Sequence, residues 1–195
     1  MISTVVLAAG RSRQAAGPTS PSSIKDNPVL QRILENVLAS AVDEVICVAD
    51  DLAATRRGIK LADRRLIWHL NTAAAAQGQS SAVIAGLWAS HPQSDGVLFV
   101  AGEPPVAHKE LISAMITGFE NTPVAIVAAI SSGQPPNPIL FRRDLYPELL
   151  RLTGDDRGLS LLEKHIDKSA LVEWPEEYPS NMAQRQTYAG FKGRL

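Results

Sequence analysis

Cysteine and long apolar segments are both scarce in this chain of 195 residues, and each shortage excludes a class of protein. The single cysteine, Cys47, rules out an internal disulfide, and its place in the apolar run VICVA predicts a buried thiol rather than a nucleophile. No apolar stretch reaches the ~18 residues that are needed to span a bilayer, and the first residues lack a basic segment followed by a signal-type apolar run. We therefore expect a soluble, cytoplasmic protein without a membrane partner.

A large excess of charge of either sign is also absent. The 19 lysine and arginine residues and the 20 aspartate and glutamate residues nearly cancel, so no overall field attracts nucleic acid or an anionic membrane surface. A small-molecule ligand fits this balance better. The length is sufficient for one well-buried α/β domain, and the composition requires no second. This predicts a single domain over residues 1–195.

Two common kinds of catalytic site lack their sequence signatures. The 4 histidines show no spacing that is typical of a zinc site. We expect His69 to pack beside Trp68 in a strand and the other histidines to lie at helix ends. The serines have neither a nearby histidine nor a G-x-S-x-G elbow, so nucleophilic hydrolysis has no support in the sequence.

Short apolar runs alternate with segments of helix length along the chain. We predict strands at Thr4–Leu7, Glu44–Ala49, Leu66–Leu70, Gly96–Val100, Val124–Ile130 and Ile139–Phe141. We predict helices after Pro28, where apolar residues recur at helical spacing from Val29 to Leu38, and over Ser80–Ser90, His108–Phe119, Asp144–Leu152 and Leu159–His165. This alternation predicts an α/β fold with a mostly parallel sheet. Ligands bind beyond the carboxyl ends of strands in such folds, where the loops after Leu7 and Val100 lie.

The segment from Val5 to Ser20, VVLAAGRSRQAAGPTS, is the most informative part of the chain. Gly10 allows the backbone to approach a ligand closely, and successive amide N–H groups at such a turn can form an anion-binding concavity. Arg11 and Arg13 add positive charge. Small residues after a first strand are also ordinary choices for tight packing, so this loop alone leaves both interpretations open.

Five segments follow one another in an order that is typical of one family. The first is the loop from Leu7, compared with the pattern L-A-A-G-x-S-x-R-M-G-x-P-K, and the second is GQSSAVIAGL at Gly78–Leu87. The others are GVLFVAGEPPV, then NPILF, then TGDDRGLSLL. Together they resemble the nucleotidyltransferases of the MobA-like superfamily, particularly the branch that attaches a nucleotide to molybdopterin.

This resemblance implies a three-layer, Rossmann-like nucleotidyltransferase fold with helices on both faces of a twisted sheet. It implies CTP as the nucleotide, bound by Leu7, Ala8, Ala9, Gly10, Arg11, Ser12, Gly78, Ser80 and Ser81. Glu103 stands where the family has the aspartate that binds magnesium, so it is the implied Mg²⁺ ligand and, with Arg13, the implied catalytic group. Asn137 and Pro138 match the segment that lines the acceptor-substrate side.

Several charged positions of the family are altered here. Gln14 and Thr19 stand where the family has arginine and lysine, and Ala183 stands where a second metal-binding aspartate is expected. Losing one preorganised contact to the transition state costs ~3–4 kcal/mol. Arg11, Arg13 or Lys25 could compensate. The acidic pair at 155–156 could bind a metal or cap the helix that follows, and we favour capping.

Three hypotheses therefore stand. The first is a nucleotidyltransferase of the molybdenum-cofactor type, which transfers CMP from CTP to a phosphorylated pterin or a similar acceptor. The second keeps the fold without the transfer: a degenerate family member that binds a nucleotide or cofactor, or serves as a scaffold for a partner protein. The third is a transferase that acts on a sugar or alditol phosphate.

Overall fold

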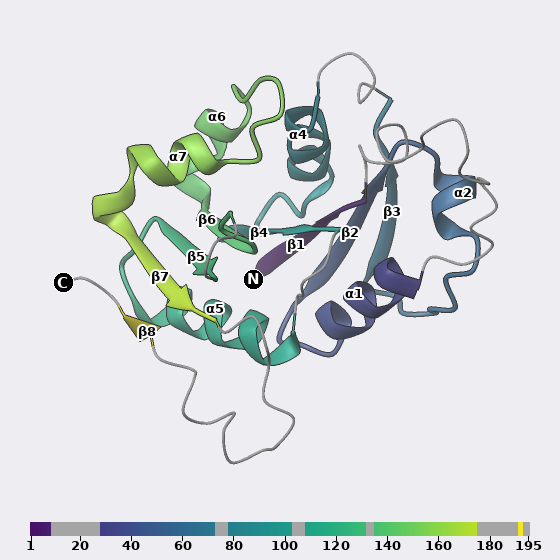
Figure 1. The fold of residues 1–195 in the computed structure, drawn as a ribbon, viewed down its shortest axis with the longest axis horizontal. Coiled ribbons are helices and arrows are strands. Elements are labelled where there is room, and N and C mark those ends of the chain that lie inside the picture. Colours follow the sequence, from purple (N-terminus) through teal and green to yellow (C-terminus); the bar gives the residue numbers. More distant parts are fainter. Residues whose placement is uncertain (9–27, 73–77, 103–107, 132–134, 175–190, 193–195) are drawn as a thin grey trace.

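Eight strands form one sheet in the computed structural model, which describes the chain except for residues 9–27, 73–77, 103–107, 132–134, 175–190 and 193–195. The order across the sheet is β3-β2-β1-β4-β6-β5-β7-β8 (Figure 1). The strands are β1 (Ile2–Leu7), β2 (Glu44–Ala49), β3 (Leu66–Leu70), β4 (Gly96–Ala101), β5 (Ile126–Ile130), β6 (Ile139–Arg142), β7 (Ser169–Glu173) and β8 (Phe191–Lys192).

Strand direction divides the sheet into two halves. Strands β3, β2, β1 and β4 run parallel to one another, with Leu7 level with Val48 on one side and with Ala101 on the other. Strand β6 runs antiparallel to β4 and to β5, β7 runs parallel to β5, and β8 is antiparallel to β7. The carboxyl ends of the four parallel strands therefore meet at one edge, which we call the carboxyl edge, and their starts form the amino edge.

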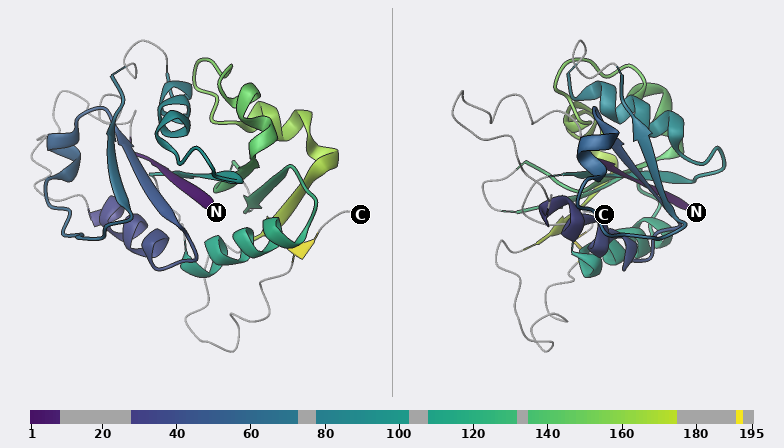
Figure 2. Two further views of the ribbon diagram at one scale, coloured as in Figure 1. Left: turned by 180° about the vertical axis from the view of Figure 1, so that it is seen from behind. Right: turned by 90° about the vertical axis from the view of Figure 1, so that its right-hand side faces the viewer.

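Helices cover both faces of the sheet. The described helices are α1 (Pro28–Leu38), α2 (Leu52–Arg56), α4 (Ser80–Ala89), α5 (Lys109–Asn121), α6 (Tyr146–Leu149) and α7 (Leu159–Lys164), with short 3₁₀ turns at Arg143–Leu145 and Ile166–Lys168. Helices α1 and α5 lie on one face, whereas α4, α6 and α7 lie on the other (Figures 1 and 2). The predicted three-layer, mostly parallel α/β fold is confirmed.

Two hydrophobic cores hold the three layers together. Alternate residues of β1 point to opposite faces, so Val6 packs in the core beneath α1 and α5, and Val5 packs in the core beneath α4. Gly86 of α4 lies so close to β1 that an added Cβ would overlap the Val5 side chain. This close approach fixes α4 directly above β1 and places its first residues at the carboxyl edge.

Local predictions about burial are largely confirmed. In α1 the predicted apolar stripe is buried except for Val29, which is 40% exposed. Cys47 is fully buried in β2, and burial raises the pKa of its thiol to about 12, which makes it inert. None of the helices in the described part of the chain combines the length and apolar character that a membrane crossing requires.

Some elements differ from the prediction. Strand β5 begins at Ile126 rather than Val124, because the preceding residues turn back and Val124 N–H donates to the Thr122 carbonyl oxygen at 2.8 Å. The helix predicted over Asp144–Leu152 is only a 3₁₀ turn followed by the four residues of α6. Strand β7 was not predicted, and it extends the sheet by pairing with β5.

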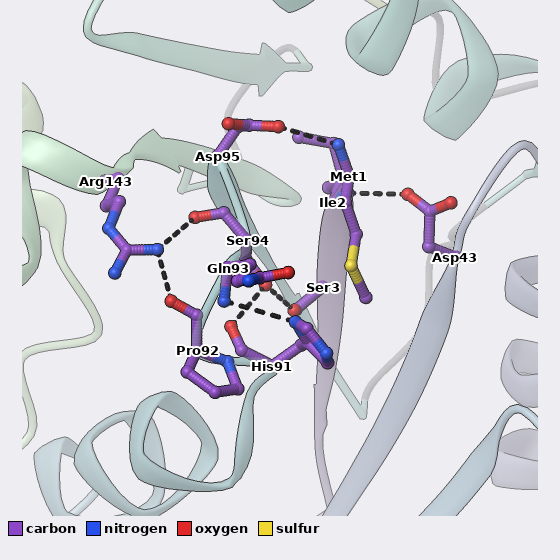
Figure 3. A network of polar contacts seen from close by, with 10 residues as sticks. All are labelled: Met1, Ile2, Ser3, Asp43, His91, Pro92, Gln93, Ser94, Asp95 and Arg143. Carbon is purple, nitrogen blue, oxygen red and sulfur yellow. Dashed lines mark hydrogen bonds and ion pairs between the residues drawn. The ribbon is translucent and has the colours of Figure 1, made fainter.

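A polar network closes the amino edge (Figure 3). The buried Ser3 hydroxyl contacts Ser94 Oγ and donates to Glu44 Oε1 at 2.5 Å. The Ser94 hydroxyl donates to the His91 carbonyl oxygen at 2.8 Å. The Arg143 guanidinium donates to the carbonyl oxygens of Pro92 and Ser94. These bonds tie the turn before β4 to β1, β2 and the residues after β6.

Two arginines close helix ends nearby. Arg65 donates to the Leu38 carbonyl oxygen at 2.7 Å, at the last residue of α1. Arg142 donates to the carbonyl oxygens of Phe119, Thr122 and Val124 and lies over the Phe119 ring at the end of α5. Both guanidinium groups thus satisfy carbonyls at or just beyond a helix end, where the helix leaves its last carbonyls without partners.

Candidate functional site

Strands β1 and β4 end side by side at the carboxyl edge. Gly102 N–H donates to the Leu7 carbonyl oxygen at 3.0 Å, and Ala8 N–H donates to the Val48 carbonyl oxygen at 2.9 Å. A Cβ on Gly102 would lie 2.7 Å from that same Leu7 oxygen, so glycine permits the close approach. The segment that continues to the predicted phosphate loop and the segment that continues to Glu103 therefore leave the sheet from adjacent points.

Many predicted site residues lie outside the described part of the chain. They are Ala9, Gly10, Arg11, Ser12, Arg13 and Glu103, together with the altered or compensating positions Gln14, Thr19, Lys25 and Ala183. The described residues contain no group of three or more His, Cys, Asp or Glu side chains that could hold a metal ion. Leu7, Ala8, Gly78, Ser80, Ser81, Asn137 and Pro138 are described.

The start of α4 is held at the carboxyl edge by a turn from much later in the chain. Gly78 has a φ of +73°, and an added Cβ would lie 2.5 Å from the Gly154 carbonyl oxygen, so this position requires glycine. Ser80 N–H donates to the same oxygen at 2.9 Å. The segment 78–81 and the turn 154–158 thus form one unit, which the resemblance alone did not reveal.

Ser81 is engaged within the protein. Its hydroxyl donates to the Gly78 carbonyl oxygen at 2.7 Å and accepts from Asn71 Nδ2 at 2.9 Å, and the residue is 3% exposed. Asn71 follows β3, and its N–H donates to the Ala49 carbonyl oxygen. Ser81 therefore fixes the start of α4 to the ends of β2 and β3.

Asn137 lies at the end of β4, although it precedes β6 in the sequence. Its Oδ1 accepts from the Ala101 N–H at 2.9 Å, and its own N–H donates to the Ala129 carbonyl oxygen at 3.0 Å. The side chain thereby holds the last residue of β4 just before the predicted metal-binding turn. Pro138 is buried, and its carbonyl oxygen accepts from the Ala129 N–H.

A small hollow lies among residues of β1, β4 and β6. Its volume is about 290 Å³, which includes open solvent. Most of its lining side chains are apolar, and Asn137 and Arg157 contribute its polar side chains. The lining residues are Leu7, Phe99, Ala101, Pro136, Asn137, Ile139, Arg157 and Leu159. Leu7 and Asn137 of the predicted site are thus brought together, and Arg157 joins them without having been singled out from the sequence.

The acidic pair beside Arg157 has a structural role. Asp156 Oδ1 accepts from the N–H groups of Gly158 and Leu159 at 2.7 and 2.9 Å, which caps the start of α7. Asp155 Oδ1 accepts from the Gln79 N–H at 3.3 Å and so binds the turn to the start of α4. Capping, which we favoured from the sequence, is the role observed for Asp156.

One protein family matches most of this chain. Residues 4–169 match the model of the MobA-like NTP transferase domain. No curated protein matches the chain.

Several solved structures share the fold at low sequence identity. Rv0371c from Mycobacterium tuberculosis H37Rv is 22% identical, with a TM-score of 0.71 and 95% of each chain covered, and a manganese complex of Rv0371c is also similar. A 4-diphosphocytidyl-2C-methyl-D-erythritol synthase from Anaerococcus prevotii is 18% identical, with a TM-score of 0.66 and coverage of 96% of this chain and 94% of that one.

Another similar structure contains bound CTP. The CMP:2-keto-3-deoxy-manno-octonic acid synthetase in complex with CTP is 14% identical, with a TM-score of 0.59 and 96% of each chain covered. At these identities the likeness to solved structures shows the fold.

Proposed function

Since this chain belongs to the family of MobA-like NTP transferase domains, we propose that it transfers CMP from CTP to a phosphorylated acceptor, molybdopterin or a similar small molecule. The observation that carries the proposal is the meeting of four segments at the carboxyl edge: the ends of β1 and β4, the start of α4, and Asn137. Ligands of open α/β sheets bind at this edge.

In this proposal the nucleotide lies across residues 7–13 and 78–81. The hydrogen bonds that fix Gly78 and Ser81 support a preformed binding surface, because a rigid surface loses little conformational freedom when the ligand binds. The acceptor enters beside Asn137, which lines the hollow. Its oxygen attacks the α-phosphorus, the bond to the β-phosphate breaks, and pyrophosphate leaves.

We propose Glu103 as the magnesium ligand. Gly102, the residue before it, is bonded to the end of β1, so the chain enters Glu103 from beside the proposed phosphate loop. A carboxylate oxygen is a ligand type that Mg²⁺ prefers. When bound, the ion would neutralise part of the phosphate charge. The related Rv0371c has been crystallised with manganese, which supports a divalent ion at this kind of site.

A second candidate function follows from the replaced charges. Gln14, Thr19 and Ala183 bring no charge to positions where the family has charged residues. A protein with this site could bind a nucleotide, or a partner protein, without transferring CMP. The identity of the acceptor also has an alternative, because a sugar or alditol phosphate would present the same phosphate chemistry as a pterin phosphate.

The deciding experiment measures pyrophosphate release and nucleotide binding together. Purified protein is incubated with CTP or GTP, with and without Mg²⁺, in the presence of molybdopterin or an alditol phosphate. A matched Gln14→Arg, Thr19→Lys, Ala183→Asp variant restores the family's charges. We expect Mg²⁺-dependent release from CTP by the wild type.

The other outcomes separate the candidates. Release by the variant alone would identify a decayed enzyme and favour the binding function. Absence of nucleotide binding by both proteins would contradict the site itself. Release only with the alditol phosphate would keep the transferase and change its acceptor.

A further inference from the structure

Arg157 is the one charged side chain among the described residues that line the hollow at the carboxyl edge. It lines this hollow together with Leu7 and Ala101, at the ends of β1 and β4, and with Asn137. Arg157 is partly buried, and most of the side chains that line the hollow with it are apolar. A partly buried arginine is less hydrated than one at the open surface, so its attraction for an anion is stronger.

The turn that carries Arg157 is rigidly built. The carbonyl oxygen of Gly154, the first residue of the turn, accepts from the Ser80 N–H at the start of α4. At the other end of the turn, the Asp156 carboxylate accepts from two backbone N–H groups. Gly158 has a φ of +101°, and a Cβ there would lie 2.5 Å from the Phe141 ring, so the turn packs tightly on β6. Arg157 is therefore held in place by its backbone rather than by its own side chain.

Within the described part of the chain, this guanidinium has no counter-ion. Neighbouring Asp155 and Asp156 direct carboxylate oxygens to backbone N–H groups, and no carboxylate of the described residues lies within ion-pair distance of Arg157. Arg65 and Arg142 differ, because protein carbonyls accept from their guanidinium groups. Arg157 thus retains its donors for a ligand.

We propose that Arg157 binds a phosphate group of the ligand in this hollow and supplies positive charge that Gln14 and Thr19 do not bring. This inference rests on the proposed function and adds a residue to the same site. A guanidinium binds two phosphate oxygens at once through parallel N–H groups. The phosphate comes either from the nucleoside triphosphate or from the acceptor, and both sources present the same oxygens.

The test is calorimetric titration with CTP, with inorganic pyrophosphate and with an alditol phosphate, alongside pyrophosphate-release kinetics. The variants are Arg157→Gln, Arg157→Lys and, as a control, Arg151→Gln, which removes an exposed arginine from the preceding segment. All should melt at the wild-type temperature, since the Arg157 side chain makes no hydrogen bond to described residues.

We expect Arg157→Gln to weaken phosphate binding by about tenfold to a hundredfold. The phosphate affinity of Arg157→Lys should lie between that of Arg157→Gln and that of the wild type, because lysine keeps the charge but loses the paired donors. Arg151→Gln should bind as the wild type does. Weaker CTP and pyrophosphate binding assigns Arg157 to the triphosphate, whereas a raised acceptor KM with unchanged CTP binding assigns it to the acceptor.

Unchanged binding and KM in Arg157→Gln would overturn the inference while leaving the proposed function intact. Conversely, a wild type that binds pyrophosphate through Arg157 but releases none from CTP would retain the inference and contradict the transferase. A wild type that binds none of the three ligands would overturn both.

Discussion

At the amino edge of the sheet, Ser3, Ser94 and Arg143 direct their polar groups to other protein groups, whereas at the carboxyl edge Arg157 faces a hollow with no counter-ion among the described residues. Satisfied polar networks add stability and rigidity. A buried or half-buried charge without a partner stabilises nothing in the absence of a ligand. The difference indicates that one edge maintains the fold and the other binds ligand, so substitutions at the two edges should have separable effects.

The largest expected effect is at the carboxyl edge. Glu103→Gln should lower the CMP-transfer rate by about 10²–10³-fold, because it removes the proposed ligand of the metal that stabilises the transition state. The melting temperature should stay at the wild-type value. Glu103→Asp is the matched control, since it restores the family's carboxylate, and it should retain activity. Equal rates in the Gln variant and the wild type would contradict the metal assignment.

Arg142→Met should lower the free energy of unfolding by about 2–4 kcal/mol, since the carbonyls at and just beyond the end of α5 lose charge-assisted hydrogen bonds. Urea unfolding measures this loss. Ligand binding at low urea should be unchanged. A selective loss of CTP binding by the folded variant would show that the two edges are not separable.

Ser94→Val should destabilise the protein by about 1–3 kcal/mol, because the fully buried hydroxyl bonds to Ser3 and to the His91 carbonyl oxygen. Tyr146→Phe is the paired control at the same edge. Its buried hydroxyl has no hydrogen-bond partner among the described residues, and burial raises the pKa of Tyr146 to about 12. Removing that hydroxyl should leave stability equal or higher, and equal losses in both variants would contradict the network.

The smallest effect is expected at Asp63, where hydrogen bonds from Arg65 lower the carboxyl pKa from 3.8 to about 2. A lowered folded pKa means that the pair stabilises the native state above about pH 4 and that this stabilisation is lost as the pH falls towards 2. The melting temperature of Asp63→Asn should therefore be slightly below that of the wild type at pH 6. Near pH 2 the two melting temperatures should be equal. A difference that persists at pH 2 would assign the effect to something other than this ionisation.

Much of the fold was predictable because most of its strands coincide with short apolar runs in the sequence. Strands β2 and β3 occur with the predicted bounds, and β1 and β4 differ by one or two residues at their ends. Strand β7 escaped prediction because Ser169–Glu173 is short and lacks strict alternation, and its strand state comes from pairing with β5. Pairing of this kind cannot be read from a local segment.

The site was predictable only in part, for a similar reason. The order of motifs identified the loop after Leu7 and the start of α4, which are local features. The bond between Ser80 N–H and the Gly154 oxygen joins segments that are far apart in the sequence, and so does the hollow that Arg157 and Leu7 both line. No periodicity or spacing encodes such contacts, so the compensating charge was sought near Gln14 and Thr19 instead.

The carboxyl edge is expected to bind the ligand and the amino edge to maintain the fold. Amide hydrogen exchange with and without CTP and Mg²⁺ tests this difference most directly. We expect added protection at residues 78–81 and 154–158 and unchanged exchange at residues 91–95 of the amino edge. Protection confined to residues 91–95, or no change at either edge at saturating nucleotide, would contradict it.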